Sequence, residues 1–443
     1  MIIATLGPFI PPKLCFYFYS MLKIIRFAFL LVIPFINCRA QEPQEVRSTT
    51  IHSIKFFKRG DQSALPLIPL NSIESLELHF DDFQTSSKSY YYTFQLCDAN
   101  WQPANLSQMD YIRGFSQNRI TQYRFSSISF TRYVHYAINL PQENCMPSRS
   151  GNYLLKVFLN GDTSKLAFTR RMLVTQDKVS VAAQVQQPFT QSLFRSHQKI
   201  TTRVNFESLD IFNPAQQVRV VVMQNNRWDN MQSASNPTFI RGKEFEYSSE
   251  DNFIFEGGKE FRWLDLRSFR LQSERVRRIE YLDKAYEVYP VPDTVRSPNR
   301  YFYYKDLNGQ YFIETLEDIN PWWQGDYGTV HFTFIPNGNS DFNHRNIYIV
   351  GEMNDWQTSA ENAMQWNEEK QLYEKNLLLK NGYYSYAFGT KDGNGPLSFR
   401  FTEGLAWDAE NQYTVLVYYR AFGARSDELV GTASLNSFVL NNR

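Results

Sequence analysis

Apolar and polar residues alternate in short runs along most of the chain, and turn residues separate these runs. A period of two indicates half-buried strands, whereas an amphipathic helix would repeat every three to four residues. Long helical repeats are missing. The pattern predicts strands at 76–80, 90–96, 122–125, 135–140, 153–159, 166–175, 179–185, 200–206, 218–224, 244–247, 253–256, 275–289, 301–304, 311–315, 328–335, 346–350, 372–378, 383–389 and 413–420.

These strands group into modules of the size typical of small β-sandwiches. We expect modules at 45–175, 176–316 and 320–425, followed by a C-terminal tail at 426–443. Within the first module, the turn Asn160-Gly161-Asp162 predicts a hairpin. Aromatic residues make up 16% of the chain, which favours pleated, half-buried surfaces. The expected fold is all-β, with three consecutive immunoglobulin-like β-sandwich modules after a cleaved signal peptide.

The N-terminal 40 residues read as upstream residues followed by a signal peptide. From Met21, basic residues flank an apolar stretch that continues to Ile36 and ends at small residues. Its uncharged core is too short for a membrane-spanning helix, which needs about 20 apolar residues. We therefore expect translation from Met21, cleavage after Ala40, a mature chain beginning at Gln41, and no membrane span.

Cys38 leaves a second processing route open. A lipoprotein leader ends in an acylated cysteine that follows small residues. Here Phe35 and Asn37 precede the cysteine and fit that pattern poorly, whereas Cys38 and Ala40 fit a small-residue cleavage site. N-terminal mass analysis separates the two routes, and we expect an unacylated chain.

Charge and cysteine content limit the classes of partner and of covalent crosslink. Cleavage removes four basic and no acidic residues, which leaves 42 basic against 45 acidic residues and a formal charge of −3. No long basic stripe remains, so nucleic acid is not expected as a partner. Cys97 and Cys145 are the two remaining thiols. They could form a disulfide in an oxidising compartment, or they could be two separately buried thiols.

The sequence contains no recognisable catalytic, cofactor or metal site. The six histidines show no close pairing along the chain. Asp81 and Asp82 would point to opposite faces of a strand, so they do not form an acid–base pair, and a solvated turn is expected there. Gly257-Gly258 lacks the residues that complete a phosphate-binding loop. We therefore expect a protein that is not an enzyme.

Four stretches together resemble the type IX secretion system plug protein family of Bacteroidetes-type bacteria. They are IKFFKRGDQ at 54–62, YYYTFQLCDANW at 90–101, SGNYLLKV at 150–157 and FEGGKEFRWLD at 255–265. The resemblance implies a periplasmic protein, peripheral to the outer membrane, that plugs the translocon β-barrel while no cargo is engaged. It implies no cofactor, and the motifs themselves look structural.

The third module is similar to the glycogen-binding sandwich modules of starch-active enzymes. The similarity lies in IYIVGEMNDW at 347–356, YEKNL at 373–377 and GYYSYAF at 382–388. Such modules bind sugar on exposed aromatic rings, for which Trp356 and Trp366 are the candidates. A tryptophan beside a turn is more often packed beneath it. The leading hypothesis is therefore a non-enzymatic plug that acts through surface contacts. A carbohydrate-binding protein is the alternative.

Overall fold

The computed structural model describes residues 44–317, 320–336, 338, 342, 345–393 and 395–438, all within one compact unit. Strands dominate, so the prediction of an all-β protein is confirmed. The helical elements that lie wholly within the described residues are single turns: η1 (Gln108–Asp110), α2 (Pro214–Gln217) and η3 (Glu352–Asn354). The predicted signal peptide and its cleavage site after Ala40 lie outside the described residues.

The first sandwich spans residues 51–175 and encloses one apolar core. Phe80 and Tyr136 of one sheet contact this core, as do Phe94 and Val157 of the other. The hairpin predicted at Asn160-Gly161 is present, with φ of 56° and 72° at the two residues. One sheet has the order β1 (Ile51–Lys58), β3 (Leu76–Asp82), β8 (Val134–Leu140), β7 (Gln122–Phe125). The other has the order β2 (Leu67–Pro69), β11 (Leu166–Thr175), β10 (Gly151–Leu159), β4 (Tyr90–Cys97), β6 (Asn118–Arg119), and β5 (Ile112–Gly114) pairs with β9 (Cys145–Pro147) nearby.

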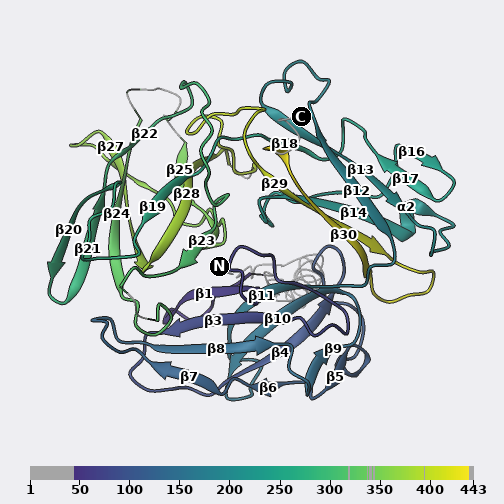
Figure 1. The fold of residues 1–443 in the computed structure, drawn as a ribbon, viewed down its shortest axis with the longest axis horizontal. Coiled ribbons are helices and arrows are strands. Elements are labelled where there is room, and N and C mark those ends of the chain that lie inside the picture. The colour runs from purple at the N-terminus through teal and green to yellow at the C-terminus, as the bar shows by residue number, and fades with distance from the viewer. Residues whose placement is uncertain are drawn as a thin grey trace, which may run out of the picture. The chain divides into compact units, whose positions relative to one another are not determined.

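The second sandwich is built from two separate parts of the chain, residues 180–256 and 412–436. Figure 1 shows the C-terminal strands, in yellow, beside β14. One sheet contains β12 (Ser180–Gln186), β13 (His197–Asn205), β17 (Glu244–Tyr247) and β16 (Phe239–Arg241), with β18 (Ile254–Glu256) paired to β13. The other has the order β15 (Gln232–Ala234), β14 (Val218–Gln224), β29 (Gln412–Tyr419), β30 (Glu428–Asn436).

The third sandwich, residues 262–391, is inserted between these two parts. Its core joins apolar residues of both sheets, such as Leu264, Val330 and Phe388. One sheet contains β19 (Arg262–Asp265), β28 (Gly382–Lys391) and β23 (Tyr311–Ile313), with β25 (Asn346–Val350) paired to β28. The other has the order β20 (Val276–Leu282), β21 (Ala285–Pro290), β24 (Tyr327–Ile335), β27 (Leu372–Lys380), β26 (Gln365–Asn367), with β22 (Asp293–Thr294) paired to β24.

The structure therefore corrects two of the predicted boundaries. Residues 262–316 belong to the third sandwich and not to a second module ending at 316. Residues 428–436 are the edge strand β30 of the second sandwich and not a tail. Both errors have one cause, the pairing of β14 with β29, which completes the second sandwich with C-terminal strands. The local pattern of either strand carries no information on a partner so far away in sequence.

The strand predicted at 301–304 is absent. The segment is instead an ordered loop, held by tyrosine hydroxyls that donate to the preceding motif. Tyr301 donates to the Glu260 carboxylate at 2.5 Å, and Tyr304 donates to the Glu260 and Phe261 carbonyls at 3.1 and 2.9 Å. These side-chain bonds replace the backbone ladder that alternating tyrosines would otherwise make.

Candidate functional site: the joints between the sandwiches

The motif at 54–62 connects the first sandwich to the third. Lys55 is buried, and its Nζ forms an ion pair with Glu352 Oε2 at 2.6 Å. Gln62 bridges the backbone of Ile313 twice, donating to its carbonyl at 3.1 Å and accepting from its N–H at 2.9 Å. A side-chain amide that pairs with a strand in this way extends the sheet hydrogen bonding across the joint.

A buried ion pair lies at the centre of the same joint. Asp81 accepts from Lys380 Nζ at 2.5 Å, from Tyr327 Oη at 2.5 Å and from His135 Nδ1 at 2.6 Å. Burial opposes ionisation of Asp81, but the adjacent Lys380 and His135 outweigh it and lower the pKa of this carboxyl. Lys380 also donates to the carbonyl of Trp322 at 2.6 Å. The pair therefore has the additional hydrogen bonds that buried charges require.

The two aspartates correct the expectation of a solvated turn. β3 continues through Asp82, and both side chains are buried. They do point to opposite faces, as the pleat requires. Asp82 faces the other way and accepts from Tyr90 Oη at 2.9 Å and from Lys88 Nζ at 2.8 Å.

An aromatic stack continues this joint beside the ion pair. Trp322 of the third sandwich lies parallel to His79 of the first, with ring centroids 3.8 Å apart. His79 Nδ1 lies 3.1 Å from His135 Nε2, so β3 and β8 bring together two histidines that are far apart in sequence. Neither belongs to a group of three potential metal ligands in the described part of the chain. The stack thus joins β3 and β8 of the first sandwich to Trp322 of the third.

The motifs at 90–101 and 150–157 connect the first sandwich to the second. Cys97, Ala99 and Trp101 pack in one apolar cluster with residues of the second sandwich that include Met223 and Leu416. At its margin, the Ala99 N–H donates to Asp427 at 2.8 Å.

Asn152 makes the polar contact at the centre of that second joint. Its amide donates to the carbonyl of Asp98 at 2.9 Å and accepts from Tyr418 Oη at 2.8 Å. Asn152 and Tyr418 are both buried. Because a buried amide or hydroxyl without a partner is costly, this pair fixes the position of β29 against β10.

The motif at 255–265 leads from the second sandwich into the third. A Cβ at Gly257 would lie 2.0 Å from the carbonyl oxygen of Ala406, so only glycine fits there. Farther along, Phe261 N–H and Asn308 N–H both donate to Asp306, whose pKa burial raises to about 7.

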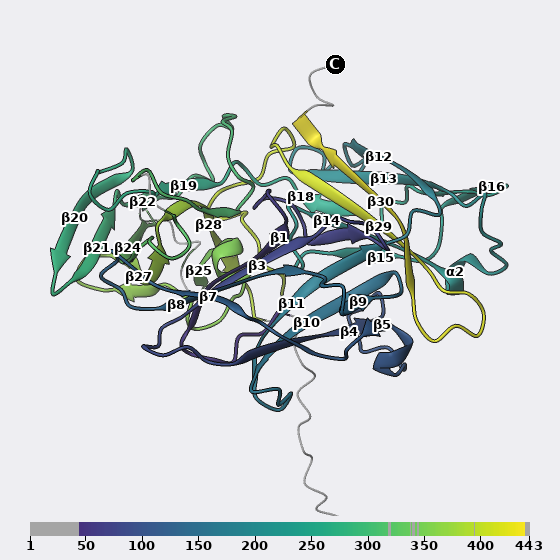
Figure 2. The same ribbon diagram turned by 60° about the horizontal axis from the view of Figure 1, so that its bottom comes forward.

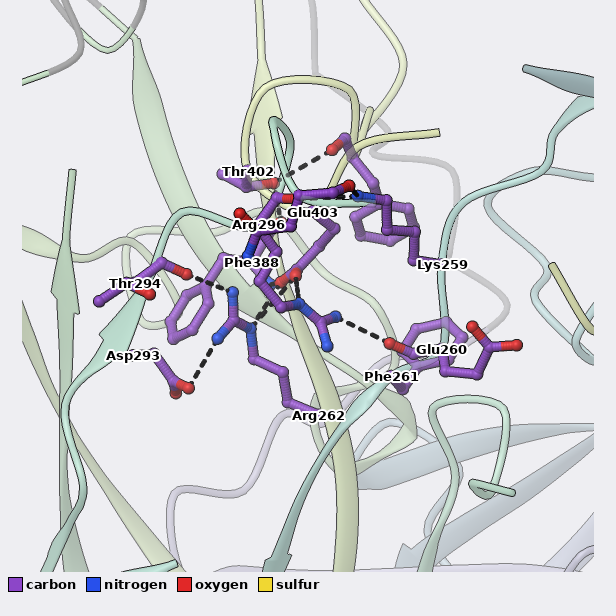
Figure 3. Close-up of polar contacts among 12 residues, drawn as sticks. Lys259, Glu260, Phe261, Arg262, Asp293, Thr294, Arg296, Phe388, Thr402 and Glu403 are labelled. Atoms are coloured by element: carbon purple, nitrogen blue, oxygen red, sulfur yellow. Dashed lines mark hydrogen bonds and ion pairs between the residues drawn. The ribbon is translucent and has the colours of Figure 1, made fainter. Parts of the chain in front are cut away.

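Arg262 in this motif is the centre of a buried charge network (Figure 3). It donates to Asp293 at 2.7 Å, to Glu403 at 2.9 Å and to the carbonyl of Thr294 at 2.7 Å. Arg262, Asp293 and Glu403 are each less than 5% exposed. The guanidinium fork thus bridges β19, β22 and the loop after β28.

Glu403 has further partners in this network. It also accepts from Arg296 at 2.6 Å and from the Phe388 N–H at 2.9 Å. Burial opposes its ionisation, but Arg262 and Arg296 outweigh burial and lower the pKa of Glu403 to about 2. The charged atoms of Arg262, Asp293 and Glu403 all have partners, so the network holds these segments together.

These joints contain all four stretches on which the family resemblance rests, and comparison with known proteins agrees with that resemblance. Residues 51–176 match the family model described as the type 9 secretion system plug protein 1st domain. The chain carries a type 9 secretion system plug domain. That domain coincides with the first sandwich.

The structural similarity extends beyond the plug domain. A crystal structure of a hypothetical protein from Parabacteroides merdae ATCC 43184 superimposes with a TM-score of 0.84 at 28% sequence identity. The match covers 89% of this chain and 98% of that one. A search of curated proteins found no match. The arrangement of all three sandwiches is therefore shared with a solved structure, whereas the family model describes only the first.

The tryptophans predicted as sugar contacts have different environments. Trp356 is buried; its ring lies against Phe261 and beneath the Arg227 guanidinium, 4.4 Å from the ring centroid. A Cβ at Gly309, where φ is +78°, would lie 2.2 Å from the Trp356 ring. Trp366 is 37% exposed and packs against Tyr373 at the edge strand β26. Trp356 is thus a packing residue, which removes one of the two candidate sugar contacts.

We predict that Trp356→Ala lowers the free energy of unfolding by about 3 to 5 kcal/mol, because it opens a large cavity beside Arg227. Trp366→Ala, on the partly exposed edge, should cost less than about 1.5 kcal/mol. Chemical denaturation of both variants measures the difference. A Trp356→Ala protein of unchanged stability that had lost glucan binding would contradict this assignment.

Cys97 and Cys145 are both buried and free in the structure. Cys97 lies at the joint between the first and second sandwiches, whereas Cys145 lies in β9 beside Tyr92. Burial raises the pKa of Cys97 to about 12 and that of Cys145 to about 11. Of the two alternatives, the structure matches separately buried thiols, which at neutral pH are unreactive.

A search of the described residues for long apolar helices finds none capable of crossing a membrane.

The residues that hold the sandwiches together were not identified from the sequence as interacting. The sequence signal that could have identified them is a charged residue within or beside apolar residues. Examples are Lys380, which follows three leucines, and Arg262, which follows Phe261. Such charges are buried only with partners, but the sequence does not name the partner.

Proposed function

We propose that this chain is a non-enzymatic periplasmic protein that plugs the outer-membrane translocon barrel of the type IX secretion system while no cargo is engaged. The observation that carries the proposal is the match of residues 51–176 to the plug domain model. The full-length similarity to the Parabacteroides protein is compatible with it, but that protein's printed title assigns no function.

The joints supply a physical reason why this fold suits the task. A plug has to cover a wide pore without its own domains separating, so these domains must move as one body. Hinge motion between the first and third sandwiches would separate Asp81 from Lys380 and Lys55 from Glu352. Separating a buried ion pair leaves an uncompensated charge, which typically costs about 3 to 5 kcal/mol. The fully buried Asp81–Lys380 pair, together with the partly exposed Lys55–Glu352 pair, favours a rigid assembly.

The contact with the barrel must also be reversible, because the plug has to leave when cargo loads. Such a contact resembles a non-obligate interface, with a total buried area of roughly 1,600 Å² and a polar rim. A near-neutral mature chain suits it, since strong electrostatic steering is unnecessary for a partner in the same compartment.

Deletion of the gene tests the proposal. Secretion should continue at least in part, while the outer membrane becomes permeable to large antibiotics or dyes, and the wild-type gene should restore the barrier. Affinity purification of the barrel should bring this chain with it. A tight outer membrane in the deletion strain, together with a purified barrel that lacks this chain, would refute the plug function.

A further inference from the structure

Strand β7 is an open edge of the first sandwich. Its sheet ends at β7 among the described residues, and all four residues, Gln122–Phe125, are exposed. Figure 1 shows β7 next to β8 at the lower left, and Figure 2 shows the same two strands from a second direction. An open edge presents unpaired backbone groups, to which another strand can add.

The register identifies the free backbone groups. The Ser126 N–H donates to the Tyr133 carbonyl at 2.8 Å, which marks 126 and 133 as a hydrogen-bonded pair of the ladder, while the Tyr133 N–H donates to the Ser126 hydroxyl at 3.1 Å. Pairs alternate along antiparallel strands, which makes Arg124 and its partner His135 the next bonded pair. The N–H and C=O groups of Tyr123 and Phe125 therefore point away from β8, toward the open edge.

The two faces of β7 offer different surroundings to a strand placed beside it. Tyr123 and Phe125 lie on one face, with rings 6.1 Å apart, and are 45% and 53% exposed. On the other face, a cleft of about 460 Å³ is lined by His79, His135 and Trp323, among others. The Arg124 guanidinium lies over the Trp323 ring at 4.8 Å from its centroid. Alternate side chains of an added strand would meet aromatic rings on one face and Arg124 beside the cleft on the other.

The loop after β7 extends the apolar side of this edge. Ile128 is 64% exposed and has φ of +71°, a strained conformation for a β-branched residue. The loop is held in place by buried Asp326, which accepts from the Phe130 and Thr131 N–H groups at 2.7 and 3.1 Å. Strain that the surrounding structure enforces is characteristic of functional loops. Here it directs an apolar side chain outward beside the open edge.

The charge around β7 selects the kind of partner. β7 and the loop that leads from it to β8, residues 122–133, contain two arginines, Arg124 and Arg132, and no lysine, aspartate or glutamate. This segment is basic although the mature chain as a whole is close to neutral. Acidic side chains are the complement of such an edge.

We propose that the β7 edge binds an extended segment of a partner protein whose residues alternate between acidic and apolar side chains. The acidic side chains face Arg124 and the cleft, and the apolar side chains cover Tyr123 and Phe125. The inference rests on the proposed function only in one respect, the identity of the protein that carries this segment. Binding of a free peptide of this pattern does not depend on the barrel.

A labelled peptide of alternating Glu and Val residues, titrated into the purified mature chain, is the direct test. It should bind, and Arg124→Glu should weaken its affinity about 10-fold or more. The matched control is Arg241→Glu, because Arg241 is also an exposed arginine on an edge strand, β16 of the second sandwich. That variant should leave the affinity within about twofold of the wild type.

Two further probes separate strand addition from simple charge attraction. The same peptide with N-methylated backbone amides keeps its charge but cannot pair with an edge, so its binding should be lost. Hydrogen exchange should show protection of the Tyr123 and Phe125 amides when the unmodified peptide binds. The proposal is overturned if the Glu–Val peptide fails to bind at about 1 mM, if the N-methylated peptide binds equally well, or if Arg124→Glu has no effect. If the peptide binds while the deletion strain keeps a tight outer membrane and the purified barrel lacks this chain, the site is retained and the plug function alone is refuted.

Discussion

Arg262→Met should lower the free energy of unfolding by about 3 to 5 kcal/mol. The substitution keeps most of the side-chain volume but removes the cation that Asp293 and Glu403 share in the buried network of Figure 3. Each carboxylate would remain buried with one fewer partner, and Glu403 would depend on Arg296 alone for its charge. Chemical denaturation measures the loss.

A matched arginine in the same sandwich provides the control. Arg270 is 69% exposed at its side chain and lies 3.8 Å from Glu317, so Arg270→Met should cost less than about 1 kcal/mol. Arg262→Lys should fall between these values, since an ammonium retains the charge but cannot bond Asp293, Glu403 and the Thr294 carbonyl together. Equal stabilities of the Arg262→Met and Arg270→Met proteins would show that the network does not hold the sandwich together.

The same network has a predictable pH dependence. The pKa of Glu403 is about 2 in the folded protein, against an ordinary 4.5. Because the folded value is the lower one, the unfolded chain binds the proton first as the pH falls. The stabilisation from Glu403, about 3 kcal/mol, is therefore complete above pH 4.5 and is lost between about pH 4.5 and 2. In the Arg262→Met protein this acid-dependent loss should be smaller, which parallel denaturation series at several pH values would reveal.

Sequence patterns were sufficient for most strands, although not for β30 or the loop at 301–304, but they did not identify the partners of the strands. β14, β24 and β29 were predicted because each is a short run with its own apolar alternation or continuous apolar core. The pairing of β14 with β29 depends on a chain that leaves the second sandwich and returns after the whole third sandwich. Local alternation is the same whether a strand's neighbour is near or far in sequence, so consecutive modules were the simplest interpretation.

The candidate site was missed for a related reason. Asp81 was interpreted as part of a solvated turn after Phe80, because adjacent aspartates in a strand would point to opposite faces and could not act as a pair. Its partner, Lys380, is 299 residues away, and the Arg262–Glu403 pair spans 141 residues. The motifs that resemble the plug family were recognised as structural, and they do lie at the joints. Their specific contacts, such as that of Gln62 with the Ile313 backbone, depend on the docked third sandwich.

The joint between the first and third sandwiches should be equally sensitive to the loss of one charge. Lys380→Met is expected to cost about 3 to 5 kcal/mol, because Asp81 would remain buried without its cation. Lys370→Met is the control: Lys370 is exposed and pairs with Glu374 at 2.8 Å, so its replacement should cost less than about 0.5 kcal/mol. Urea denaturation of the two variants, side by side, measures the contrast.

A double variant tests whether the cost arises from the unpaired charge. Asp81→Asn combined with Lys380→Met removes both charges, so it should be more stable than Lys380→Met alone, although Tyr327 and His135 lose a charged acceptor. Hydrogen exchange locates the damage: Lys380→Met should expose the amides of 320–327, which dock on the first sandwich, while those of β4 and β10 stay protected. If β4 and β10 lost protection to the same extent, the ion pair would be a determinant of the whole fold and not of this joint.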